Sequence, residues 1–259
     1  MKNARLALAG LAAAMLIPAQ ALADATVAAI KGDVRMGNTL LNQGQRVYSG
    51  ATLNTSQGAQ VTLKFDDDQQ IVLNENTTFR IADFRYRPQE PRGDRAVFDL
   101  LRGALRFVTG VIGARNPSTV ALRAPQMTIG IRGTDFMVAI VNPAYVNVVS
   151  GSIAASNSAG TVVFGEGAVG QVLNSATLAA PIQATALPPA ASGAFSNLTA
   201  AQVGAAVTPA AAQGAAAGAA TGAVAAPGLG VGAAVTLGVG AAIIGTAVDD
   251  GETTTTTHH

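Results

Sequence analysis

Charged and aromatic residues are confined to one part of this 259-residue chain, which limits where a folded core can form. Ten of the eleven aromatic residues lie between Tyr48 and Phe164, and every Lys or Arg after position 23 lies between Lys31 and Arg132. No charged residue occurs from position 167 to position 248. Because a core needs large apolar side chains, we expect one folded region followed by a tail rich in Ala, Gly and Thr.

The composition removes several classes of function. The chain has no Cys, and its two His are the last two residues, so it offers no disulfide, no cysteine nucleophile and no internal imidazole for a triad or a zinc site. The formal net charge of +1 gives no reason to expect nucleic acid as a partner. The mature lysines, Lys31 and Lys64, do not stand in an S-x-x-K motif. We therefore predict a non-enzymatic protein with no cofactor, no metal site and no bound nucleic acid.

The first 23 residues have the pattern of a cleaved signal peptide. Lys2 and Arg5 precede an uncharged apolar run that is too short for a membrane span, and Ala21-Leu22-Ala23 is a small-residue processing site. An uncleaved anchor is the weaker alternative. The pattern predicts a mature protein that starts at Asp24 and lies in the periplasm or cell envelope of a Gram-negative cell.

The next 150 or so residues carry recurrent strand signals. Val61, Leu63 and Phe65 alternate with polar residues, and the segments 77–81 and 136–140 repeat this period of two. Gly and Asn gather between such runs, at 37–38, 42–44, 74–76 and 151. The pattern predicts an all-β domain of short strands.

An apolar-x-Gly-x-apolar segment occurs three times, around Gly32, Gly103 and Gly151. A Gly inside a strand marks a bulge, a bend or a close approach of two backbones. The repetition predicts strands that turn corners at matching places. Two architectures fit this pattern, a β-solenoid-like stack and a sandwich, and the sequence does not choose between them.

Several motifs in order resemble the FecR domain. They are Gly32-Asp33-Val34, Tyr48-Ser49-Gly50-Ala51-Thr52-Leu53, Val61 to Phe65, Leu101-Arg102-Gly103-Ala104-Leu105, Ile131 to Phe136, Val149-Ser150-Gly151-Ser152 and Gly165-Glu166-Gly167. The resemblance covers residues 27–172. It implies a link to periplasmic signalling and to regulation of ferric-iron transport. Because the β domain follows the signal peptide directly, we expect this chain to lack the cytoplasmic region through which family members act on a sigma factor.

Two motifs are predicted to serve the structure. In Gly133-Thr134-Asp135-Phe136 we expect Gly133 to serve a backbone conformation, Thr134 a local hydrogen bond and Phe136 the core. Asp66-Asp67-Asp68-Gln69 replaces the family's Asp-Gly turn, so that turn is expected to be longer or differently shaped. The Asp run lacks the spacing of a calcium loop, which favours a solvated hairpin turn over a metal site.

A basic segment is the candidate partner-binding site. Residues 84–95 contain two Pro and two aromatic residues and are predicted to form an exposed loop. The candidate binding residues are Arg85, Tyr86, Arg87, Arg92 and Arg95. Arg can pair bidentately with carboxylates or phosphates, and Tyr can stack on a sugar or a guanidinium. We expect an envelope protein or an anionic envelope polymer as the partner. The alternative is a solvated loop with internal ion pairs.

The chain divides into a signal peptide (1–23), a FecR-like β domain (24–175), an Ala/Pro/Gly-rich linker (176–227), a Gly-rich apolar segment (228–248) and a polar Thr-rich end (249–259). We expect the tail to be mostly disordered or weakly helical, with a short helix at 197–207 capped by Thr199. Segment 228–248 has the length of a membrane span but few strongly apolar residues, so insertion, self-association and a disordered tail stay open. A structural or surface-displayed envelope protein, attached through this segment, is the alternative to a binding module.

Overall fold

The computed structural model describes residues 24–201 and 203, and it confirms the predicted all-β fold. The strands are β1 Ala25–Lys31, β2 Val34–Met36, β3 Thr39–Leu40, β4 Arg46–Val47, β5 Thr52–Thr55, β6 Gln60–Phe65, β7 Gln70–Leu73, β8 Thr78–Arg85, β9 Arg95–Val108, β10 Val120–Ala124, β11 Met127–Ile140, β12 Ala144–Asn157, β13 Gly160–Gly165, β14 Val169–Val172 and β15 Ala180–Ile182. The helices are α1 Val111–Arg115 and α2 Pro189–Thr199, with 3-10 turns η1 Pro91–Gly93, η2 Pro117–Thr119 and η3 Ala184–Ala186.

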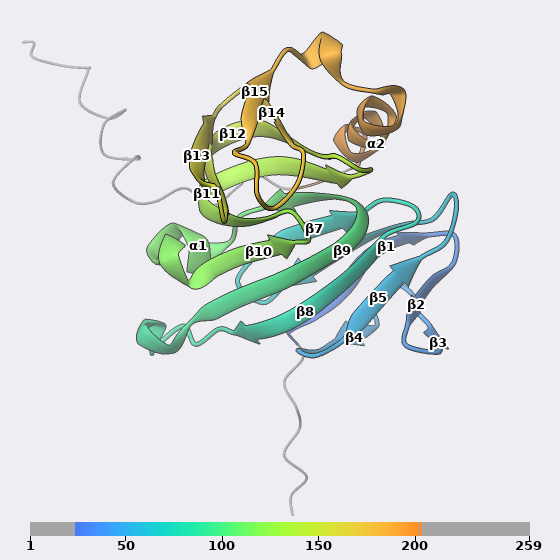
Figure 1. Cartoon of the computed structure of the whole chain (residues 1–259). Coiled ribbons are helices and arrows are strands. Elements are labelled where there is room, and N and C mark those ends of the chain that lie inside the picture. The colour runs from blue at the N-terminus through green and yellow to red at the C-terminus, as the bar shows by residue number, and fades with distance from the viewer. Residues whose placement is uncertain (1–23, 202, 204–259) are drawn as a thin grey trace, which may run out of the picture. The chain divides into compact units, whose positions relative to one another are not determined.

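The fifteen strands form one hydrogen-bonded sheet that is folded into two layers (Figure 1). The first layer contains β1, β4, β6, β7, β14, β15, the second halves of β9 and β11 and the first half of β12. The second layer contains β2, β3, β5, β8, β10, β13, the first halves of β9 and β11 and the second half of β12. The three 14-residue strands β9, β11 and β12 therefore belong to both layers.

The chain passes between the layers at bends with positive φ along two opposite edges of the first layer. Gly32, Gly58, Asn76 and Gly103 lie along one edge, which we call the corner line, and Gly133 and Gly151 lie along the other. Gly103 and Gly151 lie inside β9 and β12, and Gly32 joins β1 to β2, so the predicted bends at these glycines are confirmed. Gly32 and Gly103 bend at the same edge, whereas Gly151 bends at the opposite one, so the places match only for the first two. Neighbouring bent strands run antiparallel, whereas a β-solenoid stacks parallel rungs. Of the two predicted architectures, the sandwich describes the layers.

The layers enclose a core of apolar side chains that point inward from both. Phenylalanine rings make contacts across it: Phe65 of the first layer lies 5.0 Å from Phe84 and 5.3 Å from Phe98 of the second, measured between ring centroids. Phe98 also contacts Phe107, which stands beyond the bend of the same strand. The bend at Gly103 thus lets one strand supply rings to both sides of the core.

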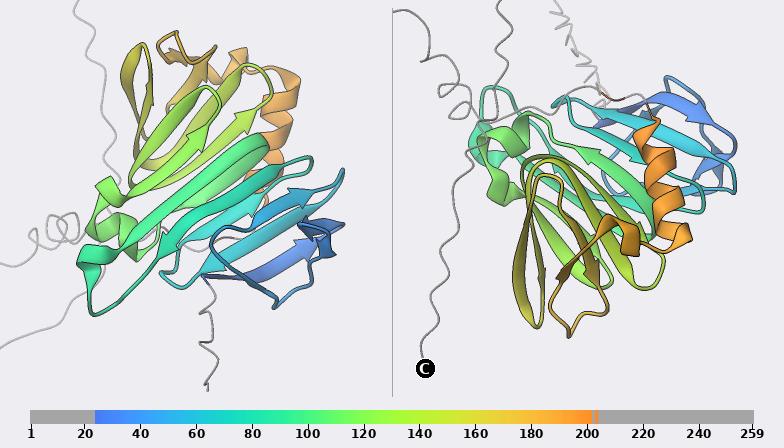
Figure 2. Two further views of the ribbon diagram at one scale, coloured as in Figure 1. Left: turned by 60° about the horizontal axis from the view of Figure 1, so that its bottom comes forward. Right: turned by 90° about the horizontal axis from the view of Figure 1, so that it is seen from above.

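Helix α2 covers the outer face of the first layer (Figure 2). Its buried residues Ala191, Phe195 and Leu198 follow helical spacing and pack on that face, which includes Met137 and Tyr145. The folded part therefore extends past the predicted boundary at residue 175, because β15 and α2 lie in the segment predicted as a linker.

The helix predicted at 197–207 is wrong in its position. Helix α2 begins at Pro189 and ends at Thr199, whose hydroxyl donates to the Phe195 carbonyl instead of capping a helix start. The predicted apolar segment 228–248 lies outside the described residues. Within the described part of the chain, no helix is long and apolar enough to cross a membrane.

The turn between β6 and β7 departs from the predicted solvated hairpin. Asp68 takes the left-handed conformation (φ 64°), as a Gly would at that place. Asp67, however, is fully buried: its carboxylate accepts hydrogen bonds from the backbone N–H of Gln69 (3.1 Å) and of Ile112 (3.2 Å). It thereby joins the turn to α1. Burial raises the pKa of Asp67 to about 6, although these N–H donors lower it.

The corner line yields a prediction about stability. A Cβ at Gly103 would lie 2.5 Å from the Thr77 Cα, and φ there is +86°. Gly50 has the same φ but open space around it. We expect Gly103→Ala to lower the free energy of unfolding by about 3 kcal/mol, from strain plus overlap, and Gly50→Ala by about 1 kcal/mol, from strain alone. Denaturant titration of both variants measures the difference. If both variants lose the same free energy of unfolding, steric overlap at Gly103 does not contribute to the loss.

Asp67 yields a prediction about pH. A folded-state pKa above the usual value means that the carboxyl stabilises the fold when protonated and that this contribution is lost as pH rises through about 6. The difference in unfolding free energy between the wild type and Asp67→Asn should therefore fall by about 2–3 kcal/mol between about pH 4 and about pH 7. Denaturant titrations at each pH measure it. Asp68→Asn, in the same turn, is the control and should keep the wild-type slope; a flat difference for Asp67→Asn would contradict the assignment.

Candidate binding surface

The loop between β8 and β9 brings two of the predicted binding residues onto one carboxylate. Arg85 at the end of β8 and Arg95 at the start of β9 are cross-strand neighbours. The Nε of Arg85 lies 3.0 Å from one oxygen of Asp83, and the Nε of Arg95 lies 3.2 Å from the other. Both guanidinium groups are exposed and already share a partner, as the alternative of internal ion pairs proposed.

The remaining candidates differ in whether their side chains already have an interaction partner. Arg87 is exposed and pairs with Glu90 at 3.1 Å, and its backbone N–H donates to the buried Asp94 at 2.8 Å. Arg92, on η1, is exposed and has no ion-pair or hydrogen-bond partner in residues 24–201 and 203. Tyr86 is half-buried and packs against the core, which leaves its ring little free surface for stacking.

The predicted loop is also shorter than expected. Phe84 is 4% exposed and belongs to β8, where its ring contacts Phe65. The exposed segment therefore begins after Arg85. Its aromatic residues anchor the loop to the core and leave the arginines as the groups that can meet a partner.

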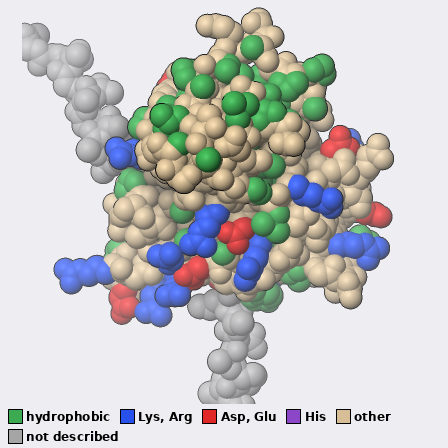
Figure 3. Space-filling model, viewed as in Figure 1, with side chains coloured by type: hydrophobic (Ala, Val, Ile, Leu, Met, Phe, Trp, Pro, Cys, Tyr) green, Lys and Arg blue, Asp and Glu red, His purple; other side chains and the backbone are tan. Residues whose placement is uncertain are grey.

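A larger basic surface lies beside this loop, on the outer face of the second layer. We call it the arginine face. Its exposed residues are Arg35, Arg80, Arg102, Arg123 and Arg132. Within the described part of the chain, none of the five has a carboxylate oxygen within 4.0 Å. In Figure 3 blue side chains gather over β8, β9 and the adjoining loop, whereas the part of the molecule around β12–β15 is mostly green and tan.

The strand register places two of these arginines in one cross-strand row. Arg80 on β8 is opposite Asp99 on β9, and Asp99 is opposite Arg123 on β10. Adjacent strands lie about 4.8 Å apart, so the two arginine Cα atoms are about 10 Å apart. The row continues through Thr128 of β11 and Ser156 of β12. Such a surface can present forked N–H donors to successive anionic groups of an extended partner.

A sixth arginine, Arg106, forms the kind of partly buried ion pair that the arginines of the arginine face lack among the described residues. Arg106 and Asp135 are each 12% exposed and form a bidentate pair, with N–O distances of 2.9 and 2.6 Å. Arg106 also donates to the Leu198 carbonyl of α2 at 3.4 Å. This pair lies on the side of the first layer and has a structural role, in contrast to the unpaired arginines of the arginine face.

The tetrapeptide 133–136 serves the structure as predicted, with one difference. Gly133 has φ 63° and Phe136 is fully buried. Thr134 makes its hydrogen bonds through its backbone: its N–H donates to the Thr109 hydroxyl and its carbonyl accepts from that hydroxyl, both at 2.9 Å. The Thr134 hydroxyl itself is buried without a partner among the described residues.

Residues 24–201 and 203 include neither His nor Cys. No group of three or more acidic side chains in this part of the chain is placed to hold a metal ion. What the surface provides in quantity is positive charge.

Comparison with known proteins supports the predicted resemblance. Residues 51–154, from the start of β5 into β12, match the family model described as FecR protein, which confirms the FecR resemblance for this part of the domain. A search of curated proteins gives no significant match. Among solved structures, two crystal structures of a candidate anti-sigma factor from Parabacteroides distasonis are similar, at 14% and 13% identity and a TM-score of 0.41 each. Each match covers 51% of this chain and 59% of that protein's chain.

Proposed function

We propose that this chain is an exported, non-enzymatic FecR-domain protein that binds an anionic partner of the cell envelope through the arginine face and the β8–β9 loop. The observation that carries the proposal is the set of five exposed arginines on one sheet face, none of which has an ion-pair partner among the described residues; Arg35 and Arg102 make hydrogen bonds to neutral groups only. The match of residues 51–154 to the FecR family model supports a role in periplasmic signalling, including regulation of iron transport.

The arginine face is the stronger part of this surface. In the loop, Arg85, Arg87 and Arg95 already pair with carboxylates, so a partner would have to compete with Asp83 and Glu90. On the face, neither Arg80 nor Arg123 has a carboxylate oxygen within 4.0 Å among the described residues, although Asp99 stands between them in the row. Exposed ion pairs are individually weak, so useful affinity requires several contacts at once, which an extended polyanion or an acidic protein surface provides.

Charge removal on the face tests this proposal. We expect the double variant Arg80→Gln/Arg123→Gln to bind lipopolysaccharide or polygalacturonate about tenfold more weakly than the wild type, a loss of about 1.4 kcal/mol. Wild-type binding should also weaken as salt rises from about 50 mM to about 200 mM, because exposed charges are screened. Biolayer interferometry with each immobilised polymer measures both effects.

The control is Arg46→Gln/Lys64→Gln, which removes the same charge from exposed positions on the first layer, where Lys64 pairs with Asp68 at 3.2 Å. If the two double variants lose the same affinity, the loss depends on net charge alone, and a defined binding face is refuted. Absence of binding by the wild type to both polymers and to acidic envelope proteins would refute the proposed function itself.

Export is part of the proposal and has its own support. Strand β1 begins at Ala25, one residue after the predicted cleavage site. The Asp24 nitrogen donates to the Val47 carbonyl at 3.1 Å, and the Asp24 carbonyl accepts from the Asp66 N–H at 3.2 Å. Cleavage before Asp24 would thus keep both bonds of the mature end, since an α-amino group can still donate.

Cell fractionation with intact-mass analysis tests export and the role of the tail. We expect the untagged protein in the soluble periplasmic fraction, with the mass of a chain that begins at Asp24. The processed mass in a fraction that requires detergent would favour the alternative, a displayed envelope protein attached through residues 228–248. An unprocessed product in the cytoplasm would contradict export.

A further inference from the structure

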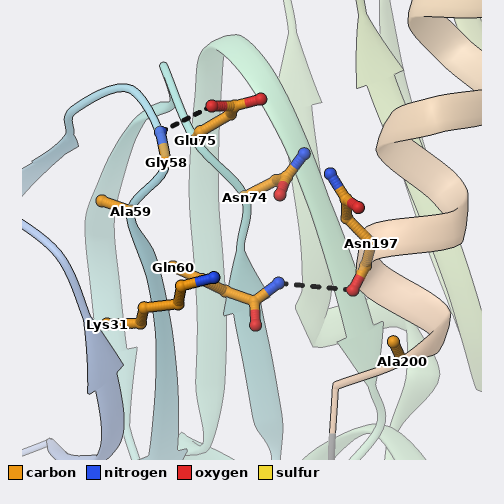
Figure 4. A pocket seen from close by; sticks show the side chains of 8 residues that line it. All are labelled: Lys31, Gly58, Ala59, Gln60, Asn74, Glu75, Asn197 and Ala200. Carbon is orange, nitrogen blue, oxygen red and sulfur yellow. Dashed lines mark hydrogen bonds between the residues drawn. The ribbon is translucent and has the colours of Figure 1, made fainter.

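Two adjoining cavities lie between helix α2 and the corner line, on the opposite edge of the fold from α1. Their volumes are about 280 Å³ and about 580 Å³. Asn74, Glu75 and Asn197 line both cavities, so the two form one continuous depression, which we call the corner groove. Figure 4 shows the smaller cavity, with side chains from the sheet on one side and from α2 on the other.

The groove contains the side-chain amide of Asn74, which has no internal partner in the described part of the chain. Asn74 is 6% exposed, and its backbone is satisfied: the N–H donates to the Ala104 carbonyl at 2.9 Å and the carbonyl accepts from the Thr55 hydroxyl. Its side-chain amide has no hydrogen bond within residues 24–201 and 203. In Figure 4 this amide points toward that of Asn197 across the cavity. An amide that has no internal partner and faces a cavity is available to pair with a ligand there.

Small residues form much of the wall. They include Gly58, Ala59, Gly103, Ala104, Ala190 and Gly193. No aromatic residue lines either cavity. The backbone of a ligand could therefore approach both the sheet corner and the helix closely, and the groove provides no ring on which a sugar could stack.

Charge is placed toward the two ends. Lys31 lines the smaller cavity and Arg102 the larger, and neither pairs with a carboxylate among the described residues. Glu75 lies between them and accepts a hydrogen bond from the Gly58 N–H at 2.6 Å, so its carboxylate is partly satisfied within the protein. The groove thus has amides at its centre and a free cation toward either end.

We propose that the corner groove binds an extended peptide segment of a partner protein, with its backbone held by the side-chain amides of Asn74 and Asn197 and with acidic side chains toward Lys31 and Arg102. An Asn amide carries both donor and acceptor atoms, so it can pair with the N–H and C=O of an extended chain. Small walls suit a backbone with small side chains at its middle. This site does not rest on the proposed function of the arginine face.

A blocked hexapeptide library provides the test. The full-length mature protein, labelled with ¹⁵N, is titrated with a positional-scanning library of acetylated and amidated hexapeptides while the side-chain amide signals of Asn74 and Asn197 are followed by NMR. We expect library subsets with Asp or Glu at the first or last position to shift both signals. The best single peptide should then bind about tenfold more weakly to Asn74→Ala, which breaks no internal side-chain hydrogen bond.

Gly193 offers a matched pair of variants that keeps the test independent of folding. A Cβ at this helical position would meet nothing within 4 Å, and both Ala and Leu favour a helix over Gly. Gly193→Leu should raise the melting temperature yet abolish peptide binding by filling the groove. Gly193→Ala should also raise the melting temperature but keep the affinity within about twofold.

Three results would overturn the proposal. One is that no library subset shifts the two amide signals. Another is that neutral oligosaccharides of glucose or N-acetylglucosamine shift them while the peptides do not, which would assign the groove to a glycan. The third is that Gly193→Leu binds the selected peptide as tightly as Gly193→Ala, which would place the peptide elsewhere. The arginine-face variant Arg80→Gln/Arg123→Gln should leave these results unchanged, because Arg80 and Arg123 do not line the groove; Arg102 is the residue that the face and the groove share.

Discussion

The close approach of backbones at the corner line is the constraint on which the rest of this fold depends. At Gly103 the chain passes so near Thr77 that a side chain has no room, and the Thr77 hydroxyl bonds both the N–H and the carbonyl of Ala104 at 3.1 Å. On the opposite edge of the first layer, the backbone at Gly151 meets Gly133 in the same way. These contacts hold neighbouring segments of the chain together at each bend. The two layers can therefore face each other along their whole length and enclose a shared core of phenylalanine rings.

The sequence allowed the corners and most of the strand character to be predicted, because both are local. The alternation of Val61, Leu63 and Phe65 appears as the inward face of β6, and the apolar-x-Gly-x-apolar echo appears as the bends of β9 and β12. Helix α2 was misplaced although Phe195, the one aromatic residue outside the main block, anchors it. Its helical spacing with Ala191 and Leu198 is a signal that the Ala-rich surroundings obscured.

The candidate sites were harder to foresee because they are assembled by register. The β8–β9 loop could be predicted because its arginines lie close together in sequence. Asp83 and Glu90 are equally close in sequence, and they pair with those arginines. Arg35, Arg80 and Arg123 are far apart in sequence and meet on one face only through strand pairing. Asn74 and Asn197 lie 123 positions apart, on a strand end and on a helix that follows the domain match. No short motif marks such a pair.

The bends have a consequence for how this fold can change in evolution. In a straight strand, insertion of one residue reverses the facing of every side chain beyond it. In β9 the glycine corner separates two arms that pair with different neighbours. A residue gained in one arm, if absorbed as a bulge before Gly103, leaves the facing of the other arm intact. Each layer can thus vary its outer surface, arginines on one and helix contacts on the other, while its counterpart keeps its alignment.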